Sequence, residues 1–168
     1  KFGKQQGKYY VPQRAAAGLD PWATPQAYDN AKDFFDTGIT WSNSLNVAQM
    51  LDKSSYSISL GNTHQDGIIS STGMDRYNVK VSADTKLTNN WSSGFTANYI
   101  TTSIDKAVTS GNGLLRTVYA APPSYDLAGI PSHVDGNPYT QNSFRGSFDN
   151  AYWAMENNKF TEDTNRFF

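Results

Sequence analysis

The chain has 168 residues, enough for one ordinary domain, and a net charge of −1. Without a block of lysine or arginine, this balance gives no electrostatic support for nucleic-acid binding or for a basic patch on a membrane surface. The absence of cysteine excludes disulfides, thiolate metal sites and cysteine catalysis.

The composition favours strands and polar loops over helices. Hydrophobic residues make up 38 % and charged residues 17 %, below the roughly 45–50 % and about 25 % usual in soluble domains. Aromatic residues, which favour strands, make up 14 %. No apolar run approaches the roughly 20 residues of a membrane-spanning helix, whereas the alternating strands of a membrane barrel need only about 9–11 residues each.

The first predicted region, residues 1–38, has little periodicity and contains three prolines, so we expect a loop. Within it the sequence predicts one short helix, which begins at Thr24 or Pro25, runs through Phe35 and ends before Gly38.

Residues 39–102 predict four antiparallel strands, at about 39–50, 55–64, 77–88 and 91–102. The segment from Arg76 to Leu87 shows the pattern best, because its odd positions are apolar or weakly polar and its even positions are polar or charged. A period of two indicates an extended strand with one apolar face and one polar face. The other three segments also carry apolar residues on one face, namely Ile39, Trp41, Leu45, Val47, Tyr56, Ile58, Leu60, Trp91, Phe95, Ala97 and Tyr99.

The connections between these strands alternate in length. The one after residue 50 is short, the one around residues 64–75 is longer, and Asn89 and Asn90 predict a tight turn. The next connection, 103–164, is very long and rich in proline and glycine, and residues 165–168 are expected to begin another strand. This alternation is typical of outer-membrane barrels, with the first and third strands running inward and both chain ends on the outer side.

Several dispersed segments resemble the start of the barrel in the SusC/RagA family of TonB-dependent transporters. The matching segments are Lys53–Tyr56, Leu60–Gly61, Gln65–Ile69, Arg76–Tyr77 and Asp84–Leu87. The resemblance covers most of residues 28–168 in order, with aspartate at position 66 where the family more often has glutamate. Because family members have a plug and a barrel of about 22 strands, we expect the chain to be a piece of a longer protein.

The resemblance implies an all-β fold in which antiparallel strands form part of a transmembrane β-barrel with long extracellular loops. It implies a location in the outer membrane of a Gram-negative, Bacteroidota-type bacterium. The implied function is import of an oligosaccharide or peptide cargo. The implied partners are outer-membrane lipid, a SusD-like surface lipoprotein, and TonB, which acts on parts of the transporter outside this chain. No cofactor is implied, and no nucleic-acid partner.

We expect no enzymatic activity. The sequence contains no G-x-S-x-G, G-x-G-x-x-G, Walker or H-E-x-x-H motif. A metal site is not expected, since His64 and His133 are far apart in sequence. The segment at Asp135 lacks the repeated acidic spacing of a calcium loop and predicts a turn.

Aromatic side chains of the long connection are the candidates for contact with substrate or a partner. Aromatic rings stack on the C–H faces of sugars, and Arg145 could donate hydrogen bonds to hydroxyl groups. The alternative is that each side chain packs the loop upon itself. The candidates are Tyr119, Tyr125, Tyr139, Arg145, Tyr152 and Trp153.

Three interpretations of the chain stay open, and they differ in what covers the apolar strand faces. In a membrane barrel, Trp41, Tyr56, Trp91 and Tyr99 would form an aromatic girdle at the lipid interface. In a soluble β-sandwich that binds carbohydrate, the same side chains would pack in a core, and a surface adhesin is a third reading. A second protein layer over Ile58, Val79, Val81 and Phe95 would contradict the transporter hypothesis.

Overall fold

The computed structural model describes residues 4–5, 7–108 and 113–168 and consists mostly of antiparallel β-sheet. The chain divides into two compact units. Unit 1 comprises residues 1–36, 68–71 and 107–160, and unit 2 comprises residues 37–67, 72–106 and 161–168. We describe each unit by itself.

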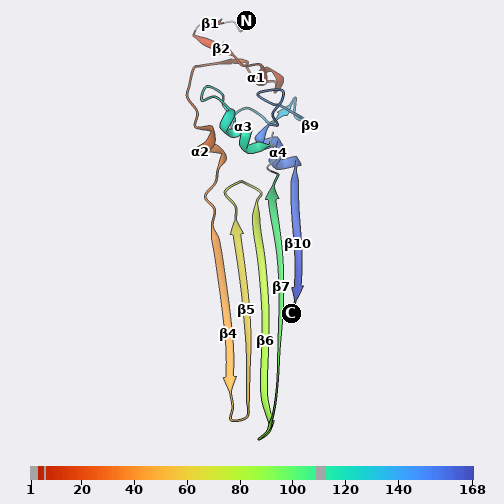
Figure 1. Ribbon diagram of the computed structural model, residues 1–168. Coiled ribbons are helices and arrows are strands. Elements are labelled where there is room, and N and C mark those ends of the chain that lie inside the picture. The colour runs from red at the N-terminus through yellow and green to blue at the C-terminus, as the bar shows by residue number, and fades with distance from the viewer. Residues whose placement is uncertain (1–3, 6, 109–112) are drawn as a thin grey trace. The chain divides into compact units, whose positions relative to one another are not determined.

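Unit 2 is built on one five-stranded sheet with the strand order β10-β7-β6-β5-β4 (Figure 1). The strands are β4 (Thr40–Met50), β5 (Ser54–Asp66), β6 (Gly73–Thr88), β7 (Trp91–Ala107) and β10 (Lys159–Phe167). Strands β4 to β7 pair in sequence order, each antiparallel to the next. The four predicted strands and their antiparallel arrangement are thus confirmed.

The two turns at one end of the sheet are tight, as the sequence predicts. Residues 51–53 connect β4 to β5, where the Leu51 amide donates to the Ser54 carbonyl oxygen at 2.7 Å. Asn89 and Asn90 connect β6 to β7, directly after a register shift between Lys86 and Thr88.

Four strands extend beyond their predicted ends. Strand β6 begins at Gly73, and β5 continues to Asp66, so the connection between them shortens to residues 67–72. Strand β7 runs to Ala107, and β10 begins at Lys159, not at residue 165. These extensions carry polar residues on both faces, such as Gln65, Asp66 and Asp75, so they leave no period-two signal.

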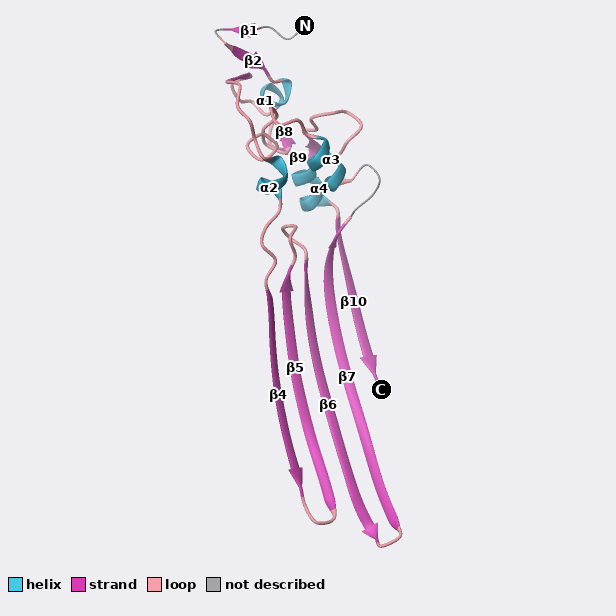
Figure 2. Cartoon of the chain, turned by 60° about the vertical axis from the view of Figure 1, so that its left-hand side comes forward, coloured by secondary structure: helices cyan, strands magenta, loops and turns pink. Residues whose placement is uncertain are grey.

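Unit 1 contains short helices and short strands joined by loops (Figure 2). The long connection predicted for residues 103–164 loses its two ends to β7 and β10, and between these strands it contains two helices and a two-stranded hairpin. The helix predicted within residues 24–35 is shorter than expected and occupies Asn30–Phe34. The elements are β1 (Lys4–Gln5), β2 (Lys8–Tyr10), α1 (Pro12–Ala16), β3 (Trp22–Ala23), α2 (Asn30–Phe34), α3 (Leu114–Ala120), β8 (His133–Val134), β9 (Asn137–Gln141) and α4 (Ala151–Asn157).

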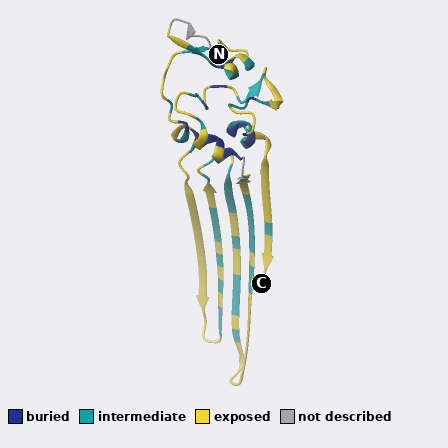
Figure 3. Ribbon diagram, turned by 45° about the horizontal axis from the view of Figure 1, so that its top comes forward, coloured by how far each residue is buried: buried dark blue, intermediate teal, exposed yellow. Residues whose placement is uncertain are grey.

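A small hydrophobic core holds α2, α3 and α4 together (Figure 3). Phe34 of α2 meets Leu114 and Val118, which lie one helical turn apart on α3. Leu127, Ala151 and Ala154 complete the core, and all six side chains are at most 4 % exposed.

Asn30 joins α2 to the loop that follows α3. Its side-chain amide nitrogen donates to the carbonyl oxygens of Tyr125 (2.9 Å) and Pro122 (3.3 Å). Its side-chain oxygen accepts from the Leu127 amide at 3.1 Å. Since Asn30 is only 6 % exposed, water cannot easily replace these bonds.

Asn142 and Asn150 act in the same way at the start of α4. The Asn142 side chain donates to the carbonyl oxygens of Gln13 (2.8 Å) and Pro131 (3.0 Å). The Asn150 side-chain oxygen caps α4 by accepting from the amides of Tyr152 and Trp153, and its nitrogen donates to the Asn142 carbonyl oxygen at 2.8 Å. Loops that would otherwise lack backbone partners are thus fixed by buried amides.

We expect Asn30→Ala to lower the free energy of unfolding of unit 1 by about 2–4 kcal/mol, because the substitution leaves the Leu127 amide without an acceptor. Faster hydrogen exchange at Leu127, followed by NMR or mass spectrometry, would report the loss. Asn157→Ala is the matched control, since its exposed side chain bonds only to Trp153. Equal protection in both variants would contradict the role of Asn30.

Candidate functional site

The first candidate site is the apolar face of the sheet in unit 2. The pairing register aligns its side chains in rows across the strands: Leu45 opposes Leu60, Leu60 opposes Val79, and Val79 opposes Tyr99. The next rows are formed by Val47, Ile58, Val81 and Ala97, and by Tyr56, Ala83 and Phe95. We call these eleven residues the apolar band: Leu45, Val47, Tyr56, Ile58, Leu60, Val79, Val81, Ala83, Phe95, Ala97 and Tyr99.

The apolar band is uncovered in unit 2. Ile58 is 47 % exposed, Val79 40 % and Phe95 59 %, while Val81 is half-buried. In the described part of unit 2, all strands belong to one sheet, and no second layer of this unit lies over the band.

Polar and aromatic residues mark the ends of the apolar band. At one end lies a row with Asn43, Asn62 and Tyr77, followed by a row in which His64 contacts Asp75 (Nδ1 to Oδ1, 2.7 Å). At the end near the tight turns lie Leu87 and Trp91, which are 56 % and 70 % exposed. Of the predicted girdle, Tyr56 and Tyr99 lie at the margins of the band, Trp91 lies at the turns, and Trp41 lies in the polar row of His64.

The opposite face of the same strands, which we call the polar face, carries mainly hydrophilic side chains, with Ile100 opposite Asn78 and Ile104 opposite Met74. Ser59 opposes Lys80 and Lys80 opposes Asn98, while a neighbouring row contains Ser57, Ser82 and Thr96. A Cβ at position 61 would lie 2.2 Å from the Asn78 side-chain oxygen, so a larger residue there would displace the Asn78 side chain.

The second candidate site comprises the six loop residues singled out from the sequence, all of which lie in unit 1. Tyr119 and Tyr139 are 71 % and 88 % exposed, so both rings are available to a ligand or partner. Tyr119 comes directly after the buried Val118 of α3, and its ring lies against Phe35 with 6.1 Å between ring centroids.

Tyr125 and Arg145 belong to one aromatic stack inside unit 1. Tyr125 packs on Phe144 at 5.5 Å between ring centroids, and Phe144 stacks on Phe148 at 6.0 Å. The guanidinium carbons of Arg116 and Arg145 lie 4.7 and 5.3 Å from the centre of the Phe148 ring. Such cation–π contacts hold both arginines near one ring.

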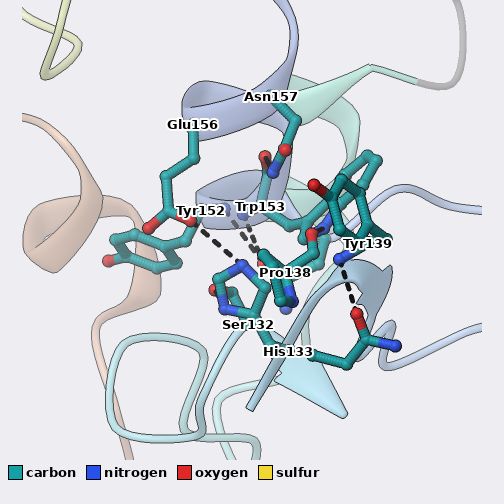
Figure 4. A network of polar contacts seen from close by, with 10 residues as sticks. Ser132, His133, Pro138, Tyr139, Tyr152, Trp153, Glu156 and Asn157 are labelled. Atoms are coloured by element: carbon teal, nitrogen blue, oxygen red, sulfur yellow. Dashed lines mark hydrogen bonds and ion pairs between the residues drawn. The ribbon is translucent and has the colours of Figure 1, made fainter.

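Tyr152 and Trp153 anchor α4. Tyr152 packs edge-on against Phe34 at 5.3 Å, and its hydroxyl donates to the Asp33 carbonyl oxygen at 3.4 Å. The Trp153 indole Nε1 donates to the Pro138 carbonyl oxygen at 2.9 Å, as Figure 4 shows, and so ties α4 to the hairpin that carries Tyr139. The six residues therefore do not form one cluster: Tyr119, Tyr139 and Arg145 are exposed, and the other three are half-buried within unit 1.

The hairpin of β8 and β9 turns at Asp135 and Gly136, which confirms the predicted turn. Both residues have positive φ, 47° and 69°, the conformation favoured in two-residue hairpin turns. At its base, His133 Nε2 lies 3.2 Å from a Glu156 carboxylate oxygen, and His133 Nδ1 lies 3.0 Å from the Ser132 hydroxyl (Figure 4). Among the described residues, no three His, Cys, Asp or Glu side chains are grouped so as to hold a metal ion.

Sequence reasoning missed Asn30, Asn142 and Asn150, which position these loops. Asn150 had a readable signal, because asparagine directly before a helix-forming segment is a favoured N-cap. The other two look like ordinary loop asparagines in the sequence.

Comparison with known proteins yields no relative: no family model and no curated protein matches the chain. Within the residues that the structure describes, no helix has the length and apolarity needed to cross a membrane. Function is therefore inferred from the two faces of the sheet and from the packing of unit 1.

We expect Tyr125→Phe to keep or raise the stability of unit 1 at neutral pH, by up to about 1 kcal/mol, because the buried Tyr125 hydroxyl has no hydrogen-bond partner among the described protein atoms. Burial raises the pKa of Tyr125, and the charge of Asp126 raises it further. A raised tyrosine pKa stabilises the fold below the unfolded value near 10, and this contribution is lost as the pH rises through the folded value.

Urea unfolding at pH 7 and above pH 10 would measure both effects, with Tyr125→Phe losing less stability at alkaline pH than the parent chain. Tyr152→Phe is the control, since it removes a hydroxyl that donates to Asp33. A large destabilisation by Tyr125→Phe at pH 7 would show that its hydroxyl has a partner.

Proposed function

We propose that the chain forms part of the wall and outer loops of a TonB-dependent outer-membrane transporter of the SusC/RagA type. The transporter imports glycans or peptides together with a SusD-like lipoprotein, and this chain acts in transport and not as an enzyme. One observation carries the proposal: the strands of unit 2 have an uncovered apolar band on one face and a polar face behind it.

The height of the apolar face supports a lipid environment. From Tyr77 to Leu87 there are ten residue steps, about 33 Å along a strand. A strand tilted by about 45° spans about 23 Å of this length across a membrane, close to the roughly 25 Å apolar band of outer-membrane barrels. Aromatic side chains at both margins, Tyr77 and Trp91 among them, fit the interfacial girdles of such barrels.

The soluble sandwich explains the apolar band less well. A sandwich buries the inner face of each sheet under a second sheet about 10 Å away. A monomeric protein in water rarely exposes a continuous apolar patch larger than a few hundred Å². In lipid, by contrast, the exposed side chains of Ile58, Val79 and Phe95 are in a favourable apolar environment.

The open edges of the sheet fit a segment of a larger barrel. In the described sheet, β4 and β10 each pair on one side only. Every residue of β4 is exposed. An unpaired edge is unstable in lipid because its backbone groups lack partners. The proposal therefore assigns further strands to both edges.

Unit 1 supplies the outer loops in this proposal. Tyr119 and Tyr139 are the two candidates for contact with cargo or with the SusD-like lipoprotein, because their rings are exposed. Tyr125, Arg145, Tyr152 and Trp153 are assigned to the internal packing that holds the loops in shape. TonB would act on parts of the transporter outside this chain.

Site-directed spin labelling tests the membrane assignment directly. Single cysteines at positions 78–82 of the complete transporter, reconstituted in lipid vesicles, are labelled and exposed to oxygen, which partitions into lipid, and to a water-soluble nickel complex. We expect positions 79 and 81 to respond to oxygen and positions 78, 80 and 82 to lie away from lipid. Labels at 79 and 81 that are shielded from both reagents would place these residues in a protein core and overturn the proposal.

A charge in the middle of the apolar band should be costly. We expect Ile58→Arg to lower the free energy of unfolding from lipid vesicles by about 2–4 kcal/mol, the cost of arginine on the lipid face near the bilayer midplane. Ser57→Arg, one residue earlier on the polar face, is the matched control and should cost much less. Equal effects of both substitutions in urea titrations would contradict a lipid-facing band.

A further inference from the structure

The charges of the sheet are divided between its two faces. Among the strand residues of the sheet, four of the six carboxylates lie on the face of the apolar band, namely Asp66, Asp75, Asp105 and Asp163, and one basic side chain, Lys159, lies on the same face. The polar face carries the other five basic side chains of the strands, which are Arg76, Lys80, Lys86, Lys106 and Arg166, against the two carboxylates of Asp84 and Glu162.

The position of β10 in this division follows from its pairing with β7. Phe168 and Asn98 exchange two backbone hydrogen bonds, of 3.1 and 2.9 Å, so they lie opposite each other on the polar face. Arg166 lies two residues from Phe168 and therefore on the same face.

Four of the five cations on the polar face, Arg166 among them, form no ion pair within the described part of the chain. Lys106 forms an ion pair with Glu162. Among the described residues, Arg76, Lys80 and Lys86 form no ion pair. They follow one another along β6, with about 13 Å from Arg76 to Lys80 and about 20 Å from Lys80 to Lys86. The polar face therefore has an excess of positive charge, which attracts anions.

The surroundings of Lys80 are hydroxyl and amide groups. Ser59 and Asn98 lie opposite it on the two neighbouring strands, and Ser57, Ser82 and Thr96 form the adjacent row. The Thr96 hydroxyl donates to Ser82 at 3.2 Å, whereas the Ser57 and Ser59 hydroxyls make no side-chain hydrogen bond within the described residues. Phe168, opposite Asn98, is the aromatic side chain of these rows, whereas the side chains paired with Lys80 on β5 and β7 carry hydroxyl and amide groups.

We propose that the polar face of unit 2 binds an acidic oligosaccharide, whose carboxylate or sulfate groups pair with Arg76 and Lys80 and whose hydroxyls bond to the surrounding serines and asparagines. This inference rests on the proposed function, because a transporter wall turns its polar face toward the cargo. It narrows the cargo from glycans or peptides to anionic glycans.

Calorimetric titration of the complete transporter in detergent tests the proposal. The probe is a galacturonic acid hexamer, compared with its methyl ester, which has the same sugar backbone without charge. We expect the acid to bind roughly tenfold more tightly than the ester at low salt and to lose affinity as NaCl rises. The Arg76→Gln/Lys80→Gln double variant should lose roughly tenfold in affinity for the acid. Lys32→Gln, which removes an exposed charge on α2, should not.

Three results would overturn the inference. The ester could bind as tightly as the acid, or a glutamate hexapeptide could bind as tightly as the hexagalacturonate. The third result is a double variant that melts at a lower temperature but binds the acid with unchanged affinity. This result would show that Arg76 and Lys80 pair with carboxylates of the protein and not with the cargo. Spin-label accessibility on the same preparation separates this inference from the transporter proposal. If the apolar band is exposed to lipid but the acid binds no more tightly than the ester, only this inference is wrong. If the band is shielded from lipid, the transporter proposal is wrong.

Discussion

The organisation of unit 2 depends on a single constraint, the alternation of side chains across one sheet. Because every second side chain points to the same face, the register that aligns Leu60 with Val79 also aligns Ser59 with Lys80. A shift by one residue would exchange the two sets of side chains and place the lysine among the aliphatic residues. The sheet therefore separates an apolar side from a cationic side across the thickness of one strand, without a core of its own.

Unit 1 is stabilised in a different way. Its helices have five to seven residues, too short to be stable alone, and its hydrophobic core is small. Buried asparagines compensate, since Asn30, Asn142 and Asn150 each bond to backbone groups of segments distant in sequence or of the following helix. Most aromatic side chains of this unit serve the same packing, which leaves Tyr119 and Tyr139 exposed.

The sequence predicted the parts of the fold in which the two faces of a strand differ. Val79 and Val81 alternate with Lys80, so the strand and its apolar face could be read directly. Where both faces are polar, as at Gln65 and Asp66 of β5, the continuation of the strand gave no signal. The helices α3 and α4 are too short to show a helical period. Of the candidate site, the exposure of Tyr139 and the burial of Tyr125 depend on contacts between distant segments, such as the bond from Trp153 to Pro138, which no local pattern encodes.

The return of the chain from β7 to β10 has a consequence for the order of folding. Strands β4 to β7 are joined by short connections, so their pairing is local and can form early. The contact between Asn98 and Phe168, in contrast, closes a loop of about seventy residues, whose entropic cost grows with the logarithm of its length. If helices α2, α3 and α4 assemble first, most of that loop is already ordered and the cost falls. Folding of the segment between β7 and β10 then brings the last strand, β10, close to its partner β7 and so assists the completion of the sheet.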